Sequence, residues 1–304
     1  MSAPEREQAG SRFAYASALT PLVFGTTYLL TTNFLPPGRP LLAALMRSLP
    51  TGLVLVVGSR LPDRRWLGRF LLLSVLWASA AFPLLFFAAY HLPGGVAAVI
   101  NSLGPICVVV LAVPVLGSAV RARQVVAGAL GVLGVALLVL RSDARLDVLG
   151  ILAMVVVVVM MALGTVLMKR WGNPPGMGPV RVTGWTFLFA GLTLLPFTLA
   201  FEGLPHSVTP TQVGGLVYLV AVSGIFAYAL WFWGIGQLNA ASVTFLGLLN
   251  PIMAALLGWL VLDQRLNLLQ ALGAALVLVS VVLGQQRRRS RRPAAAEPAA
   301  ELVR

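Results

Sequence analysis

Long apolar runs, separated by short segments rich in Pro, Gly and Arg, make up most of the chain between residues 13 and 285. The runs are continuously apolar, as in MVVVVVMMALG at 154–164. Such runs of about 20 residues are typical of helices that cross roughly 30 Å of hydrocarbon, whereas a β-barrel alternates polar and apolar positions. The pattern therefore predicts an all-α polytopic membrane protein. Its ten predicted transmembrane spans are 13–34, 40–58, 66–90, 93–116, 124–140, 147–168, 182–200, 212–236, 240–262 and 267–285.

The composition excludes a soluble protein. Of the 304 residues, 59% are hydrophobic and 10% are charged, against about 25% charged residues in an ordinary soluble domain. Two soluble cores would not bury this much apolar surface, so the excess must face lipid.

The positive charge of the chain serves topology rather than nucleic-acid binding. The net charge is +13, but most of the 22 Lys and Arg residues lie in short breaks between apolar runs. If both termini are cytoplasmic, few of these basic residues lie in the segments on the other side of the membrane, namely Arg39, Arg141, Arg145 and Arg265. The positive-inside rule thus predicts an inner-membrane protein with cytoplasmic ends. The lead 1–12 and the basic tail 286–304 flank the spans, and we expect the tail to be disordered. It acts either as a topology anchor or as a binding site for anionic lipid headgroups.

The polar residues do not form a catalytic or metal-binding set. Cys107 is the single cysteine, and His91 and His206 lie far apart in the sequence. A nucleophile with its base and a phosphate-binding glycine loop are both lacking, which excludes direct ATP hydrolysis. The acidic residues all lie outside the deep parts of the spans, so the usual carboxylate of a proton relay is missing. The sequence predicts no enzyme, no cofactor and no metal.

An internal repeat divides the chain into halves. The segment 76–105, ending in Pro105, aligns without a gap with 222–251, ending in Pro251, and the two prolines are 146 residues apart. The predicted halves are 13–140 and 141–285, each with five spans. Because five is odd, the second half enters the membrane from the opposite side. Such inverted repeats recur in secondary transporters, which bind substrate near the midplane between the halves. The alternative is a duplication that only builds a stable bundle.

A pattern seen twice carries a family resemblance. A helix with an internal Pro ends in a short hydrophilic turn in GPICVVVLAVPVLGSAV (104–120) and again in NPIMAALLGWLVLDQRL (250–266). The chain resembles the drug/metabolite transporter superfamily, EamA-like branch. This resemblance implies ten spans, two repeats, and export or facilitated transport of amino acids and other small metabolites. Ser118 and Gln264 stand where the family's turn usually carries Glu.

The paired prolines are candidate helix breakers. Pro105 and Pro251 lie deep within predicted spans, where each removes a backbone hydrogen bond and displaces the carbonyl four residues earlier. Those carbonyls belong to Asn101 and Gly247, and we expect both to be free for polar substrate groups, with the Asn101, Ser102 and Asn250 side chains nearby. The alternative is a plain kink whose carbonyls are satisfied by neighbours.

Aromatic residues gather in the third and eighth spans. Phe82 and Tyr228 are repeat-equivalent and, with Trp77, lie nearer the middle of their spans, and Trp231 follows Tyr228 in the eighth span. They either line an amphipathic cavity or form interfacial and lipid-facing contacts, as the ring residues at the span ends would. We expect Tyr228 above all to face the cavity.

Arg47 is the one charge firmly inside a span. Its long side chain either snorkels to the membrane surface or meets a substrate carboxylate. Thr26, Thr27 and Tyr28 form a further polar patch. The predicted substrate-binding residues are Thr27, Tyr28, Arg47, Trp77, Phe82, Asn101, Tyr228, Trp231 and Asn250.

Small residues at spacing four permit close helix contact. Ala127 and Gly131 in the fifth span and Ala271 and Ala275 in the tenth serve either internal packing or a homodimer face. Together these patterns predict a secondary transporter of small metabolites working by alternating access. Drug efflux, lipid handling and a non-transporting scaffold remain the alternatives.

Overall fold

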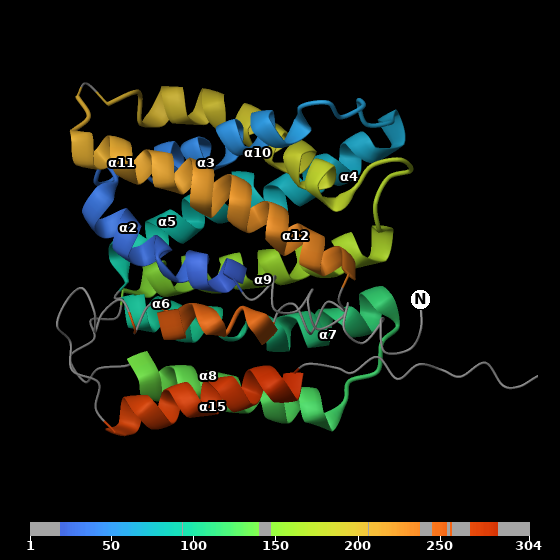
Figure 1. Ribbon diagram of the computed structural model, residues 1–304, viewed down its shortest axis with the longest axis vertical. Coiled ribbons are helices and arrows are strands. Elements are labelled where there is room, and N and C mark those ends of the chain that lie inside the picture. Colours follow the sequence, from blue (N-terminus) through green and yellow to red (C-terminus); the bar gives the residue numbers. More distant parts are fainter. Residues whose placement is uncertain are drawn as a thin grey trace, which may run out of the picture.

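The computed structural model describes residues 19–92, 94–139, 147–205, 207–237, 245–253, 256 and 268–284. Within these ranges the chain is helical, with no strand, and Figure 1 shows the helices lying side by side along one direction. Residues 19–25 are helical. The named helices are α2 (Thr27–Phe34), α3 (Pro40–Val56), α4 (Arg64–Ser74), η1 (Val75–Ser79), α5 (Ala81–His91), α6 (Gly94–Asn101), α7 (Gly104–Leu116), α8 (Ala122–Val139), α9 (Val148–Trp171), α10 (Pro179–Phe201), α11 (Pro210–Tyr218), η2 (Leu219–Phe226), α12 (Ala227–Gln237) and α15 (Leu268–Gly284).

The all-α membrane class predicted from the sequence is confirmed. Five helices are long and apolar enough to cross a membrane: Arg64–His91, Val96–Leu116, Val148–Trp171, Pro179–Phe201 and Pro210–Trp231. Shorter apolar helices are Leu19–Thr31, Pro40–Val56, Ala122–Leu138 and Leu268–Gly284. Most of the predicted span 240–262 lies outside the described residues, as do the lead 1–12 and the tail 286–304. The count of ten spans therefore stays a prediction.

Two helix pairs make the most extensive contacts, α3 with α10 and α8 with α15. Both pairs are antiparallel. Arg181 at the start of α10 donates to the Leu55 carbonyl near the end of α3 at 3.0 Å. Arg123 at the start of α8 donates to the Val282 carbonyl near the end of α15 at 3.2 Å. Figure 1 shows α8 and α15 lying along each other at one side of the bundle.

Glycines allow these pairs to approach closely. A Cβ on Gly134 of α8 would lie 2.8 Å from the Gly273 carbonyl oxygen, and one on Gly273 would lie 2.6 Å from the Gly134 carbonyl oxygen. On the same side of α8, Ser280 donates to the Ala127 carbonyl at 2.5 Å. The face of α8 that carries Ala127 therefore packs against α15 of the same chain. Ala271 and Ala275 are exposed, so the homodimer, which stays a prediction, would use that outer face of α15.

Two helices contain π-helical turns, which recur at functional sites. The first, η1, joins α4 to α5, and the second, η2, joins α11 to α12. Shifted by 146 residues, η1 falls inside η2.

The spans that carry the paired prolines are interrupted rather than kinked. Helix α6 ends at Asn101, Ser102 and Leu103 form a turn, and α7 begins at Gly104, so Pro105 stands in the first turn of a new helix. Likewise, residues 247–248 form a turn between helical residues 245–246 and 249–253. Pro is well accommodated at a helix start, where its missing N–H has no intrahelical partner.

A carboxylate fixes the beginning of α3. Both oxygens of Glu202 accept hydrogen bonds from backbone N–H groups, those of Leu41 and Leu42, at 2.7 Å each. Arg39 donates to the carbonyls of Glu202 and Gly203 at 3.1 and 3.0 Å. An acidic group at a helix N-terminus satisfies open N–H donors and complements the helix dipole. The end of α10 therefore positions the helix that carries Arg47.

We expect Gly273→Ala to destabilise the protein by about 1–3 kcal/mol, because the added Cβ meets α8 backbone in a filled contact. Gly68→Ala in α4 is the matched control, since a Cβ there has no atom within 4 Å. Thermal denaturation of the purified variants in detergent checks this. Equal melting temperatures for the two variants would contradict the close packing of α8 and α15.

Candidate functional site

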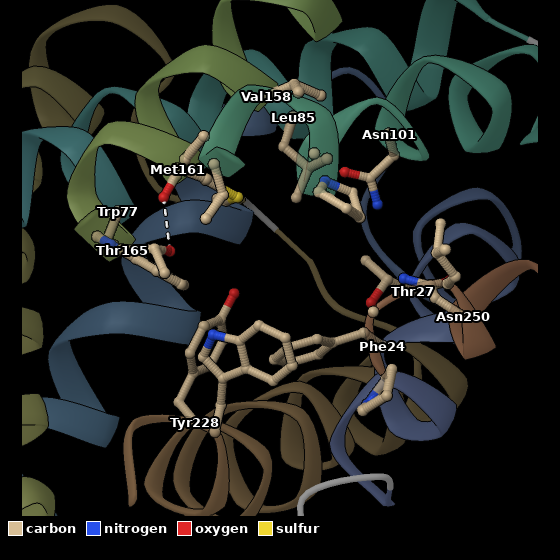
Figure 2. Close-up of a pocket in the computed structure, with 18 of the residues that line it drawn as sticks. Phe24, Thr27, Trp77, Leu85, Asn101, Val158, Met161, Thr165, Tyr228 and Asn250 are labelled. Carbon is tan, nitrogen blue, oxygen red and sulfur yellow. Dashed lines mark hydrogen bonds between the residues drawn. The ribbon is translucent and has the colours of Figure 1, made fainter. Parts of the chain in front are cut away.

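A cavity with a volume of about 130 Å³ lies inside the helix bundle (Figure 2). This volume is well above the roughly 10–15 Å³ that one water molecule needs. Residues from both halves of the sequence line it, and the interrupted helices contribute Asn101, Pro105, Gly247 and Asn250. Most of the residues predicted as a binding site meet here: Thr27, Arg47, Trp77, Asn101, Tyr228, Trp231 and Asn250.

Some predicted residues lie elsewhere. Phe82 is fully buried next to the lining, with its ring centroid 5.6 Å from that of Tyr228. Pro251 is buried beside Asn250 but does not line the cavity. The side chain of Tyr28 lies outside the described residues. Phe82 therefore supports the cavity from behind rather than facing into it.

The Arg47 side chain is enclosed by the protein, with 1% of its surface exposed. Its Nη2 donates to Ser223 Oγ of η2 at 2.7 Å. Its Cζ lies 5.3, 4.9 and 5.0 Å from the ring centroids of Phe24, Phe82 and Tyr228. These are cation–π distances. The hypothesis that Arg47 snorkels to the surface is wrong, because the rings and Ser223 hold the guanidinium inside the bundle.

Tyr228 is the centre of the ring cluster. Its ring centroid lies 4.7 Å from Phe24, 4.7 Å from Phe187 and 6.5 Å from Trp77. In Figure 2 its hydroxyl points toward the middle of the cavity. Phe226, in contrast, is 50% exposed. The eighth span thus carries rings both inside, at the cavity, and on its exposed side.

The cavity carries a positive charge. Among the lining residues that the structure describes, Arg47 is the one charged side chain. Two described carboxylates are bound elsewhere, that of Glu202 at α3 and that of Asp147, which accepts from the Gly150 N–H at 2.8 Å. In the part of the chain that the structure covers, no three His, Cys, Asp or Glu residues gather to hold a metal.

The interrupted helices alter the hydrogen bonding of the backbone carbonyls that were expected to be free. The Gly247 carbonyl accepts a hydrogen bond from the Asn250 N–H at 3.1 Å. The prediction that this carbonyl is free is therefore wrong, because a tight turn pairs it with the residue three positions later. The free carbonyl expected at Asn101 stays a prediction.

Several lining residues were not predicted from the sequence. Phe24 and Thr165 face the cavity, and Thr165 donates to the Met161 carbonyl at 2.8 Å, the dashed line in Figure 2. A signal for Thr165 existed, since LGTV at 163–166 aligns with FGTT at 24–27 and places Thr165 opposite Thr26. Ser223, the partner of Arg47, is one small residue in an apolar run and gives no such signal.

An apolar helical bundle with interrupted helices that contribute polar groups to an internal cavity is typical of secondary transporters. The chain belongs to the EamA-like transporter family, whose model matches residues 13–140 and 148–284. The resemblance to the drug/metabolite transporters is thereby confirmed, and the protein is a multi-pass membrane protein of a transporter family.

Individual relatives agree with this family. Protein PecM of Dickeya dadantii (strain 3937) is 41% identical over 265 residues, which are 87% of this chain and 89% of PecM. The probable amino-acid metabolite efflux pump of Escherichia coli (strain K12) is 25% identical over 214 residues, covering 67% of this chain and 72% of that protein. One solved crystal structure superposes with a TM-score of 0.74 at 17% identity, covering 91% of this chain and 96% of that one. That likeness shows the fold alone.

Cysteine labelling tests whether water reaches the cavity. In a Cys107→Ala background, we expect Thr165→Cys to react with a small water-soluble methanethiosulfonate reagent much faster than Thr186→Cys. Both threonines are buried, but only Thr165 lines the cavity. The rates are read by mass spectrometry of the intact protein. Equal rates would mean that the cavity is closed to water.

Proposed function

We propose that the protein is a secondary transporter that moves small metabolites, amino acids or related amphipathic compounds, across the inner membrane. The cavity is its substrate site and opens alternately to the two sides. The observation that carries this proposal is a cavity built on two interrupted helices, with Arg47 at its wall and Asn101 and Asn250 at the breaks. Broken helices of this kind supply polar groups to substrates in transporters.

An inverted repeat of residues 13–140 and 141–285 accounts for the architecture. The second predicted span, α3, pairs antiparallel with the seventh, α10, and the fifth, α8, pairs antiparallel with the tenth, α15. The helix breaks and the π-helical turns also recur at equivalent places. A two-fold axis in the membrane plane relates such halves, and exchanging their conformations converts an inward-open state to an outward-open one. This supports alternating access.

Export is the proposed direction for amino-acid-like substrates, and the name of the Escherichia coli relative, a probable amino-acid metabolite efflux pump, supports it. We propose facilitated transport or exchange rather than antiport coupled to a buried, titrating carboxylate, since the described cavity lining holds no Asp, Glu or His. Positive-inside topology supports cytoplasmic termini.

Drug efflux is the second candidate. The rings of Phe24, Tyr228 and Trp231 at the cavity favour it, because aromatic surfaces accept many flat apolar compounds. The charge on Arg47 favours metabolites, since common cationic drugs would meet a like charge.

Counterflow in liposomes tests transport. We expect Asn250→Ala and Tyr228→Ala to lower the flux of labelled amino acids at least about tenfold, a loss of some 1.4 kcal/mol of substrate stabilisation. Asn33→Ala, at an exposed position of α2, is the matched control and should keep wild-type flux. Absence of flux for a broad metabolite panel, with a folded protein, would count against the transporter proposal.

Site-directed labelling tests the inverted repeat. Leu61 and Ser207 are exposed loop residues 146 positions apart, before α4 and α11. With Cys107→Ala, we expect a membrane-impermeant maleimide to label Ser207→Cys in intact cells and Leu61→Cys only in inverted vesicles. Labelling of both from one side would mean that the halves are not inverted.

A further inference from the structure

We propose that the cavity selects organic anions, namely monocarboxylates with a flat apolar body, over matched neutral, zwitterionic and cationic compounds. The carboxylate binds at Arg47 and the body lies between the apolar walls. This inference rests on the proposed function and narrows its substrate class: amino acids, which carry the same carboxylate, enter the same cavity but bind more weakly because of their ammonium group.

Three buried donor groups at the cavity carry the proposal. Arg47 Nε, Thr27 Oγ1 and Trp231 Nε1 have no hydrogen-bond partner among the residues that the structure describes. Their residues are 1%, 6% and 7% exposed, and all three line the cavity. Buried polar groups in proteins are normally bonded, and an unbonded donor is costly. The missing partner is therefore expected to be something that enters the cavity.

The chemistry of these groups defines that partner. Guanidinium and indole N–H groups only donate, and a hydroxyl can donate. The complementary ligand group must accept several hydrogen bonds and carry negative charge. A carboxylate does both, and arginine binds it by charge-assisted and often paired hydrogen bonds.

The surroundings of Arg47 leave part of its hydrogen-bonding capacity unused. The rings of Phe24, Phe82 and Tyr228 lie close to the guanidinium carbon, and Ser223 holds one terminal nitrogen. The buried Nε has no hydrogen-bond partner among the described residues. A ligand that needs only one carboxylate contact fits this arrangement.

The rest of the cavity suits an apolar, planar body. Figure 2 shows Leu85, Val158 and Met161 on one side and the rings of Phe24 and Tyr228 on the other. Aromatic rings opposite aliphatic side chains favour a flat apolar ring between them. The positive charge of Arg47, without a carboxylate in the described lining, disfavours an ammonium group on the ligand.

A matched chemical series tests the proposal. The compounds are 3-phenylpropionate, phenylalanine, 3-phenylpropanamide and phenethylamine, which share one ring and differ in charge. In proteoliposomes loaded with labelled 3-phenylpropionate, we expect this anion to drive counterflow at concentrations about tenfold lower than the amide or phenylalanine, and phenethylamine to be weakest. Direct binding is read from the change in tryptophan fluorescence of the purified protein, to which the cavity residues Trp77 and Trp231 contribute among seven tryptophans.

Substitutions separate charge from shape. Arg47→Gln should abolish the preference for anion over amide, while Arg47→Lys keeps part of it. Because Arg47→Gln carries a risk of misfolding, Thr27→Val serves as a second variant. It removes one donor and keeps the charge, so it should weaken 3-phenylpropionate binding several-fold, and more than it weakens phenethylamine binding. Asn33→Ala should change neither.

The outcomes separate this inference from the proposed function. Transport of phenylalanine or phenethylamine at least as good as that of 3-phenylpropionate would overturn the anion preference and leave the transporter proposal standing. Anion binding by fluorescence without flux of any panel compound would support the anion site and contradict transport. Failure of both readouts in folded protein would overturn both.

Discussion

A permanent cation buried within a membrane bundle is the constraint around which the rest of the structure is arranged. An arginine in that position is stable only if its charge is surrounded by polarisable or polar groups. Here three ring faces and the Ser223 hydroxyl provide them, and they come from other helices. The helix that carries Arg47 must therefore be held accurately, and Glu202 holds it by its first N–H groups.

The backbone makes room for this arrangement through small residues and interruptions. Helix α3 fits against α10 because Gly184 and Gly191 leave no side chain at the contact, where a Cβ would meet α3 backbone at 2.7 and 2.6 Å. The interrupted spans bring backbone turns to the cavity wall, and the π-helical turn η2 presents Ser223 to Arg47. The helix packing, the helix breaks and the position of the buried charge therefore depend on one another.

Much of this arrangement was predictable from the sequence, and there is a physical reason why the rest was not. The apolar runs predicted span positions close to the described helices, and the paired prolines and ring residues pointed to Asn101, Tyr228 and Asn250, which line one cavity. A membrane helix is apolar on its protein side and on its lipid side, so periodicity does not tell which face looks inward. The direction of Arg47 and the roles of Phe24 and Ser223 therefore needed the structure. The Gly247 carbonyl was mispredicted because the proline rule assumes a continuous helix, whereas the chain forms a turn there.

The helix breaks have a consequence for how such cavities diversify. At the turns 102–103 and 247–248, part of the polarity comes from peptide groups, which every amino acid possesses. Mutation of the neighbouring side chains can therefore reshape the cavity while the polar backbone groups of the turns persist. The binding preference of such a cavity can change through single substitutions, because the backbone N–H and C=O groups at the turns are present whichever residue occupies the position.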